Sequence, residues 1–430
     1  MSLLTHLLRR SCALLLVSCA AVLAVGCGGG VGNGGTGITD DGGGIGTIIK
    51  LPPTGPGFLH GPVTGLGPLM VDGVRVEHLW GLVEDDDGNR IDPLELQLGM
   101  VVSVEGSPIV NGAIDIADTI IVHTDLHGQV TTAYDPATRR VGVLGQVVQV
   151  DANTVIDTLR GGLDDLGVGR EVVVSGLLDP VTGVYLATRI SAGDGGEIFL
   201  TRGAIADVDT AAATLRIGAQ VFDYGGLALP PLFGAGQIVR VRFDPTPTAA
   251  GHWVATAVED GSDPPQEGYV GDWRDVVGSV IGEPGFFYAG GLPVDASTAR
   301  FLPAGTPIAP GMRVQVFGAI KDGVLVAYEV DVLAAGDAGA QVGDAFTIAG
   351  RLSTKIDGRG HTFSLLGAMV IDYSSASFVG GSADDLDSYT GVLEVWGPLA
   401  PGGASLQAVQ VTFDSPPTGG GGGTQGKGGR

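Results

Sequence analysis

The chain has 430 residues, more than one hydrophobic core usually organises, so we expect several domains or a repeat array. Its 75 glycines and low charged content of 16% are typical of many short strands joined by tight turns, while 44% hydrophobic residues disfavour a disordered chain. The net charge of −24 would repel phosphate backbones, so we exclude nucleic acid as a partner.

The amino terminus has the design of an export signal. A pair of arginines precedes an apolar run over residues 12–25 that is too short for a comfortable membrane span. The segment Leu23-Ala24-Val25-Gly26-Cys27 resembles a bacterial lipobox, although lipoboxes prefer Leu where this chain has Ala24. The resemblance implies that residues 1–26 are a signal peptide and that Cys27 becomes the acylated first residue of the mature chain. An ordinary secretory signal cut nearby is the alternative.

The residues around Cys27 also predict where the protein is held. Gly28 follows the cysteine, which implies, as lipoprotein sorting is generally understood, attachment to the outer membrane, facing either the periplasm or the exterior. Residues 27–56 predict a flexible Gly-rich linker and residues 415–430 a disordered Gly-rich tail. All three cysteines lie in the first 27 residues, so we expect no disulfide, thiolate-metal or cysteine-nucleophile chemistry in the folded part.

A strand pattern, Gly-x-x-apolar-x-apolar-x-Gly, recurs along the chain. Its five copies, two of them lacking one glycine, are Gly99–Gly106, Gly169–Gly176, Gly236–Phe243, Gly311–Gly318 and Thr390–Gly397. Alternate apolar positions share one face of a strand, so each copy predicts an antiparallel strand with one buried and one solvated face. A second signature, Ala-x-x-Ile/Val, follows each copy and predicts its hairpin partner.

A recurring acid sets the repeat length. The acids Glu77, Asp151, Asp223, Asp295 and Asp372 are separated by 74, 72, 72 and 77 residues, which suits a small barrel. We predict an all-β chain of five tandem small antiparallel β-barrel repeats at residues 57–124, 125–195, 196–261, 266–336 and 345–414. We expect the acids to cap turns, the junctions at 261–265 and 334–339 to act as hinges, and neighbouring repeats to pack edge to edge.

The second repeat has a family resemblance. Its segments Gly128–Val130, Val143–Val155, Gly169–Gly176 and Leu186–Ile190 resemble the bacterial domain-of-unknown-function family numbered fifty-six sixty-six. The resemblance extends over essentially the whole mature chain and is strongest in this repeat. It implies exported tandem barrels of oligonucleotide/oligosaccharide-binding (OB) shape. It transfers no catalytic residues, and a barrel shape alone does not set function.

Two clusters are candidate metal sites. If residues 123–127 are extended, His123, Asp125 and His127 point the same way, and imidazole with carboxylate suits Zn²⁺; solvated polar residues at a repeat boundary are the alternative. In the acidic segment 84–92, Asp85 and Asp87 are candidates for Ca²⁺. An EF-hand loop starting at Asp85 would need Gly and Glu where the chain has Arg and Leu, so a plain charged turn is the alternative.

Motifs for catalysis are missing from the sequence. It has no nucleophile elbow, zinc-protease helix or dinucleotide fingerprint, so we do not expect an enzyme.

We expect a non-enzymatic cell-envelope lipoprotein, a scaffold of β-domains held to the membrane by its lipid and presenting surfaces to a glycan or an envelope protein. The alternatives are a periplasmic protein that binds Ca²⁺ or Zn²⁺ and a hydrolase of envelope polymers that uses paired carboxylates. Exposed tryptophans would stack on sugars and buried ones would fill the core; the four are Trp80, Trp253, Trp273 and Trp396.

Overall fold

The computed structural model describes residues 55–415, apart from gaps at 79–80, 158, 160–161, 180–181, 194, 196–198, 232, 263, 282–284, 334–344, 354–359 and 368. Cys27, the predicted linker up to residue 54, the tail from residue 416 and the junction at 334–339 lie outside the described residues. The described part consists of 31 β-strands and three short 3-10 helices, so the all-β prediction is confirmed. No helix in it is long and apolar enough to cross a membrane.

The strands fall into consecutive groups, which we call barrels 1 to 5. Barrel 1 contains β1 (Gly57–Leu66), β2 (Leu69–Val71), β3 (Val74–His78), β4 (Leu82–Asp85), β5 (Val101–Gly106), β6 (Ile109–Val110) and β7 (Ala113–His123). Barrel 2 contains β8 (Leu126–Asp135), β9 (Arg140–Val143), β10 (Gln146–Gln149), β11 (Val155–Asp157), β12 (Glu171–Asp179) and β13 (Val184–Ala192). Barrel 3 contains β14 (Phe199–Asp209), β15 (Thr214–Ile217), β16 (Gln220–Asp223), β17 (Ile238–Phe243) and β18 (Trp253–Asp260).

The remaining two groups of strands are barrels 4 and 5. Barrel 4 contains β19 (Val270–Val280), β20 (Phe286–Ala289), β21 (Leu292–Asp295), β22 (Arg300–Leu302), β23 (Arg313–Lys321) and β24 (Val324–Leu333). Barrel 5 contains β25 (Phe346–Gly350), β26 (Thr362–Leu365), β27 (Met369–Asp372), β28 (Ser377–Val379), β29 (Leu393–Gly397), β30 (Ser405–Gln407) and β31 (Gln410–Phe413). The 3-10 helices are η1 (Pro93–Glu95), η2 (Gly162–Asp165) and η3 (Ala383–Ser388).

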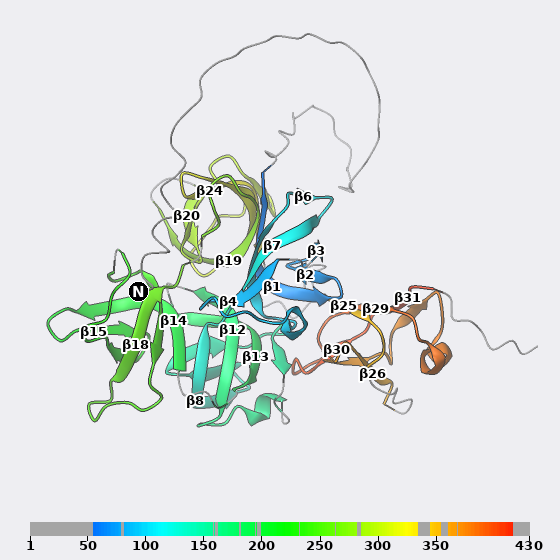
Figure 1. The fold of residues 1–430 in the computed structure, drawn as a ribbon, viewed down its shortest axis with the longest axis horizontal. Helices are drawn as coiled ribbons and strands as arrows, with labels where there is room; N and C mark the ends of the chain where they lie inside the picture. Colours follow the sequence, from blue (N-terminus) through cyan, green and yellow to red (C-terminus); the bar gives the residue numbers. More distant parts are fainter. Residues whose placement is uncertain are drawn as a thin grey trace, which may run out of the picture. The chain divides into compact units, whose positions relative to one another are not determined.

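Barrel 2 illustrates the strand pairing. β8 pairs antiparallel with β9 and β12, while β9 with β10 and β12 with β13 form hairpins. β10 and β11 run parallel to β13, which closes a ring of the OB type with one extra short strand. Figure 1 shows the ring of barrel 4 end-on, with β19, β20 and β24 around its centre. In barrel 5 the ladder is interrupted, and β26, β27 and β30 form a separate three-stranded sheet.

The recurring glycine pattern has a physical reason, which barrel 1 shows. Gly99 precedes β5 with a φ of +80°, a conformation that L side chains rarely adopt. Gly106 lies at a bulge between β5 and β7, where a Cβ would be 2.2 Å from the carbonyl oxygen of Ile116. Between the glycines, Val102 and Val104 are buried in the core, and the strand alternation turns Ser103 outward.

First strands also join the barrels to one another. β8 and β14 pair antiparallel, as expected for neighbouring barrels, but β1 pairs parallel with β19 of barrel 4 and with β25 of barrel 5. Gly271 permits the β1–β19 contact, because a Cβ there would lie 1.7 Å from the carbonyl oxygen of Phe58. One buried cluster combines barrels 1 and 5 and another combines barrels 2 and 3. Barrel 1 therefore packs on barrels that are distant in sequence, a connection that the sequence did not predict.

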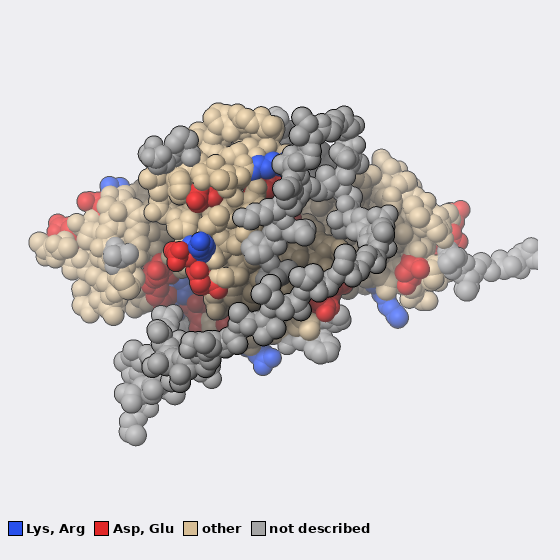
Figure 2. All heavy atoms as spheres, turned by 90° about the horizontal axis from the view of Figure 1, so that it is seen from above, with Lys and Arg blue, Asp and Glu red and all other residues tan. Residues whose placement is uncertain are grey.

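The surface reflects the low charged content. On the face drawn in Figure 2, acidic and basic side chains form small groups on an otherwise uncharged surface. Several contacts between charged or titratable side chains of the described chain lie where barrels 1 to 4 meet. This junction is the candidate functional site.

Candidate functional site

One register position recurs on the outside of each barrel. It pairs a residue of the first strand with a residue in the middle of the glycine-pattern strand, and both side chains point away from the barrel core. The five pairs are His60–Ser103, His127–Val173, Arg202–Arg240, Arg274–Gln315 and Ala349–Glu394. The first member is basic in four pairs, and the acids that face these residues are, in order, Asp275, Glu171, Asp125 and Asp72. Two of these contacts link barrels 1 and 4 reciprocally.

Ser103 lies at the centre of a hydrogen-bonded chain of side chains. Its Oγ is 2.7 Å from Nε2 of His123 and 3.0 Å from Nδ1 of His60. Nδ1 of His123 is 2.7 Å from Oδ1 of Asp86, and the backbone N–H of Thr124 donates to the other oxygen of that carboxylate at 3.0 Å. A hydroxyl, an imidazole and a carboxylate are thus connected in the order that serine hydrolases use.

His60 is enclosed by β19. Its ring stacks on Trp273, with centroids 4.1 Å apart and planes inclined by 15°, and its Nε2 lies 3.9 Å from Oδ2 of Asp275. Burial, together with the charges of His123 and Arg202, lowers the pKa of His60 well below its ordinary value, so the ring is neutral. Burial raises the pKa of Asp275 to about 7. Asp275 therefore changes its charge near neutral pH.

Asp275 occupies a position at which the other barrels have glycine. The equivalent residues, read from the strand registers, are Gly61, Gly128, Gly203 and Gly350. In barrel 2, Leu144 fills the space above Gly128 from a tight turn, where its φ is +51°. The same turn position in barrel 4 is Gly290, where a Cβ would lie 1.6 Å from the Asp275 carboxylate. Barrel 4 has exchanged a glycine–leucine pair for an aspartate–glycine pair, which places a buried carboxylate beside His60.

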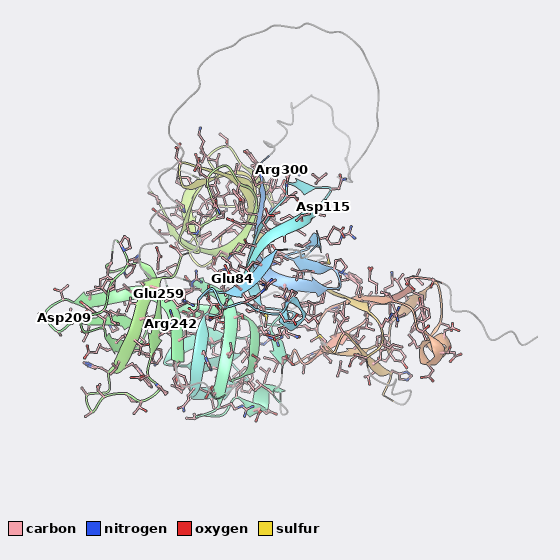
Figure 3. All side chains as sticks on the ribbon, in the orientation of Figure 1. Glu84, Asp115, Asp209, Arg242, Glu259 and Arg300 are labelled. Carbon is pink, nitrogen blue, oxygen red and sulfur yellow. The ribbon has the colours of Figure 1, made fainter. Side chains whose placement is uncertain are left out.

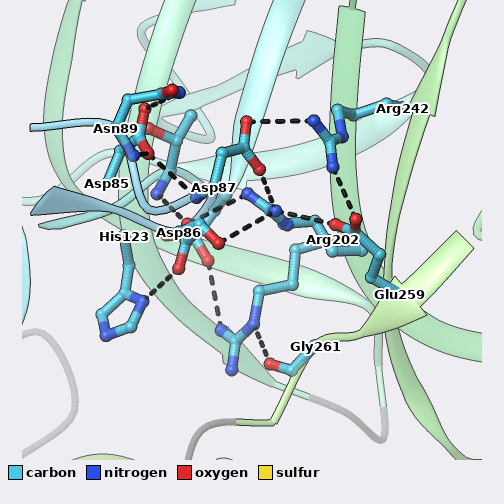
Figure 4. A network of polar contacts seen from close by, with 12 residues as sticks. Asp85, Asp86, Asp87, Asn89, His123, Arg202, Arg242, Glu259 and Gly261 are labelled. Carbon is cyan, nitrogen blue, oxygen red and sulfur yellow. Dashed lines mark hydrogen bonds and ion pairs between the residues drawn. The ribbon is translucent and has the colours of Figure 1, made fainter. Parts of the chain in front are cut away.

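A network of ion pairs continues from Asp86 (Figure 4). Arg240 lies 3.6 Å from Asp86 and 2.7 Å from Glu259, and it also contacts Asp87. Arg242 joins Asp87 to Glu259 at 3.1 and 2.5 Å. Burial would raise the pKa of Asp86, but the hydrogen bonds from His123 and from the backbone N–H of Thr124 lower the pKa overall. Asp86 is therefore ionised and accepts a hydrogen bond from the N–H group at Nδ1 of His123.

Arg202 connects three segments of the junction. One of its terminal nitrogens is 3.1 Å from Oδ1 of the fully buried Asp125, whose Oδ2 accepts a hydrogen bond from the backbone N–H of Gly176. Nε of Arg202 donates to the carbonyl oxygen of Gly261 at 2.7 Å (Figure 4). The predicted hinge at residues 261–265 is therefore held at its first residue, because a buried guanidinium needs this acceptor.

These side chains line a cavity of about 490 Å³. Its lining includes His60, His123, Trp273 and three arginines, together with six acidic residues from segment 84–87 and from the end of β18. Figure 3 shows Glu84, Arg242 and Glu259 in this part of the molecule. Because acids outnumber arginines, the cavity favours a neutral or cationic ligand over an anion.

The residues predicted to bind zinc do not converge. β7 ends at His123 and β8 begins at Leu126, so the extended segment that would align the three side chains is interrupted at the barrel boundary. Each candidate has its own partner: Asp86 for His123, Arg202 for Asp125 and Glu171 for His127. The continuous strand that the predicted alignment required is therefore not present at residues 123–127. Among the described residues, no group of three or more His, Cys, Asp or Glu side chains is arranged to hold a metal ion.

The candidate calcium residues form a charged turn. Oδ1 of Asp85 accepts the backbone N–H groups of Asp87 and Asn89 at 2.9 and 2.8 Å, and the Asn89 side chain donates to its Oδ2. Asp87 faces the other way along the network and pairs with Arg240 and Arg242. Asp85 thus caps a turn and Asp87 pairs with two arginines, so the two carboxylates do not converge on one point.

Four of the five recurring acids cap turns, as predicted. Asp151, Asp223, Asp295 and Asp372 each accept the backbone N–H of the residue two positions further on. Glu77 differs, because its side chain pairs with Arg75 at 3.1 Å.

The tryptophans divide between the core and the surface. Trp273 is buried at 2% exposure, and Trp253 is half-buried against Phe243. Trp396 is 39% exposed on β29, while Trp80 lies outside the described residues. Of the described tryptophans, Trp396 alone has the exposure that stacking on a sugar needs.

Sequence reasoning missed Ser103, His60 and Asp275 as site residues, and it considered Asp86 only as part of the acidic segment 84–92. The available signal was a basic residue followed by glycine in the first strand, at His60, at 127–128 and at 202–203, with aspartate in place of glycine at 275. That signal has meaning only when the strand registers are known.

Comparison with known proteins assigns no activity. A family described as a domain of unknown function, DUF5666, matches residues 127–191, which span the strands from β8 to β13. The match supports the resemblance of this segment to a domain-of-unknown-function family. No match was found among curated proteins or among solved structures.

Proposed function

We propose that this chain is a cell-envelope lipoprotein whose β-barrels form one scaffold, attached to the outer membrane through Cys27, that presents surfaces to a glycan or an envelope protein. The observation that supports the scaffold is the pairing of β1 with both β19 and β25. Barrels joined by backbone hydrogen bonds hold their outer surfaces in a fixed geometry. Fixed geometry favours the simultaneous use of several weak contacts.

Polar contacts between barrels support the same proposal. His60 faces Asp275, and Arg274 forms an ion pair with Asp72, so barrels 1 and 4 each contribute a base and an acid. A barrel of about 70 residues without metals or disulfides is only marginally stable, so such contacts stabilise each partner.

The chemistry of the surface favours a neutral glycan as the ligand. The net charge of −24 and the acidic cavity disfavour anionic polymers. Trp396, 39% exposed, offers one face for a sugar ring.

The anchor is tested with two cysteine variants of the full chain, expressed in a Gram-negative host that is fed labelled palmitate. We expect Cys27→Ala to lose the label and the membrane association, while Cys19→Ala, a change inside the predicted signal, keeps both. A wild-type chain that is unlabelled, or a Cys27→Ala chain that is still labelled, would remove the anchor from the proposal.

The glycan is tested by co-sedimentation of the full chain with insoluble neutral polysaccharides and with purified cell-wall sacculi. We expect Trp396→Ala to weaken binding by about tenfold, which corresponds to a stacking energy of about 1.4 kcal/mol. The matched control is Val379→Ala, another exposed apolar residue of barrel 5. Binding that is absent, or equal in both variants, would contradict a glycan site at Trp396.

A further inference from the structure

We infer that Ser103 is the nucleophile of an acyl-transfer site that hydrolyses esters of small acyl groups, with His123 as its base and Asp86 as the residue that positions the base. This inference goes beyond the scaffold function and does not rest on it. It rests on two hydrogen bonds of 2.7 Å, from Ser103 Oγ to His123 Nε2 and from His123 Nδ1 to Asp86.

The hydrogen-bond pattern assigns the protons. Asp86 is an acceptor for the backbone N–H of Thr124 and for Nδ1 of His123, so His123 has its proton on Nδ1. Nε2 of His123 is then a lone pair, and the hydroxyl of Ser103 donates to it. This is the tautomer that a general base needs to remove the serine proton.

His60 completes the environment of the hydroxyl. Because Ser103 donates to His123, its Oγ accepts a hydrogen bond from Nδ1 of His60 at 3.0 Å. The Trp273 ring stacks on His60, and the Asp275 carboxyl group lies 3.9 Å from its Nε2. Barrels 2 and 5 have a glycine–leucine pair where barrel 4 has Asp275 and Gly290, so the carboxylate beside His60 is a feature of barrel 4.

Access and charge are compatible with a substrate. Ser103 is half-buried, and the two histidines that contact it, rather than Ser103 itself, line the 490 Å³ cavity. Arg202 and Arg240 line the same cavity, so cationic groups lie on its wall, although both are paired with carboxylates. The excess of acids in the lining disfavours anionic substrates, so the ester expected here has a neutral or cationic alcohol part, such as the sugar of an acylated sugar.

The reaction is balanced without a cofactor. As Oγ of Ser103 bonds to the carbonyl carbon, its proton passes to Nε2 of His123, and that proton then goes to the leaving alcohol when the ester C–O bond breaks. Water attacks the acyl-serine while His123 takes one of its protons. The acyl–Oγ bond breaks, the proton returns to Ser103, and a carboxylic acid leaves. The net change is ester plus water to alcohol plus acid.

The first test labels the full chain, purified in detergent, with a fluorophosphonate that phosphonylates activated serines. We expect peptide mass spectrometry to place the label on Ser103. Ser103→Ala should abolish labelling, and Ser374→Ala, which changes an exposed serine of barrel 5, should leave it unchanged. A folded wild-type chain that is not labelled at Ser103 would overturn the inference.

The second test separates a positioning role of Asp86 from a structural one. With p-nitrophenyl acetate as substrate, Asp86→Asn should lower kcat by about 10²- to 10⁴-fold and displace the pH profile, because the wrong His123 tautomer is then favoured. Circular dichroism and the Tm identify any variant that fails to fold. Hydrolysis that persists at the wild-type rate in Ser103→Ala or in Asp86→Asn would refute the assignment. Loss of membrane attachment in Cys27→Ala has no bearing on either readout.

Discussion

Replacing Asp275 with asparagine tests the charge state at the centre of the junction. Asp275 is 2% exposed, and burial raises its pKa from the ordinary 3.8 to about 7. A carboxyl group whose pKa is higher in the folded than in the unfolded protein stabilises the fold while it is protonated. Its contribution is lost as the pH rises from about 4 to about 7, at about 1.4 kcal/mol per pH unit.

Asparagine remains neutral over this range and keeps an oxygen for the backbone N–H of Val276, which now donates to Asp275 at 2.7 Å. The free energy of unfolding of Asp275→Asn relative to wild type should therefore increase between pH 5 and pH 8. The increase spans the two units below the folded pKa and amounts to about 2–3 kcal/mol.

The assay is urea unfolding of the full chain at each pH unit, followed by tryptophan fluorescence. Trp273 is a suitable probe because it stacks on His60, the residue that faces Asp275. Asp322→Asn is the control, because Asp322 is exposed in the same barrel and its φ of +54° suits asparagine. A difference between Asp275→Asn and wild type that is the same at pH 5 and pH 8 would refute the raised pKa.

Three further changes test the contacts between barrels. Gly271→Val should break the β1–β19 ladder, because a Cβ would meet the carbonyl oxygen of Phe58 at 1.7 Å; limited proteolysis should then release barrel 4, while Gly226→Val, in open space, should leave the digestion pattern unchanged. Asp275→Gly and Gly290→Leu should each destabilise the fold, whereas the double change rebuilds the Gly128–Leu144 arrangement and should recover at least about 1–2 kcal/mol of the summed loss in chemical denaturation. Strictly additive losses would contradict the exchange. Arg240→Ala should cost about 2–4 kcal/mol, because Asp86, Asp87 and Glu259 lose their shared cation in a buried setting. Arg300→Ala, which removes an exposed pair with Glu329, should cost less than about 0.5 kcal/mol, and equal losses for the two arginines would refute the argument.

Local patterns in the sequence determined the strands and the turns. Alternating valines predicted the buried face of β5, since a strand with one solvated face must alternate. Glycines marked the points where the backbone takes a positive φ or approaches another strand closely, as at Gly99 and Gly106. Recurring acids predicted caps at Asp151 and its equivalents, because such a carboxylate reaches a backbone N–H two residues on. All of these interactions act within a few residues or within one hairpin.

Only the tertiary structure decided which outward-facing residues meet. Ser103, His123 and Asp86 come from β5, from the end of β7 and from the turn after β4, and no periodicity links them. Pairing of β1 with β19 brings together residues more than 200 positions apart, a choice that hydrophobic alternation leaves open. The core-facing side of a strand is predictable because it must be apolar. The contacts of its outer side depend on which barrel packs against it.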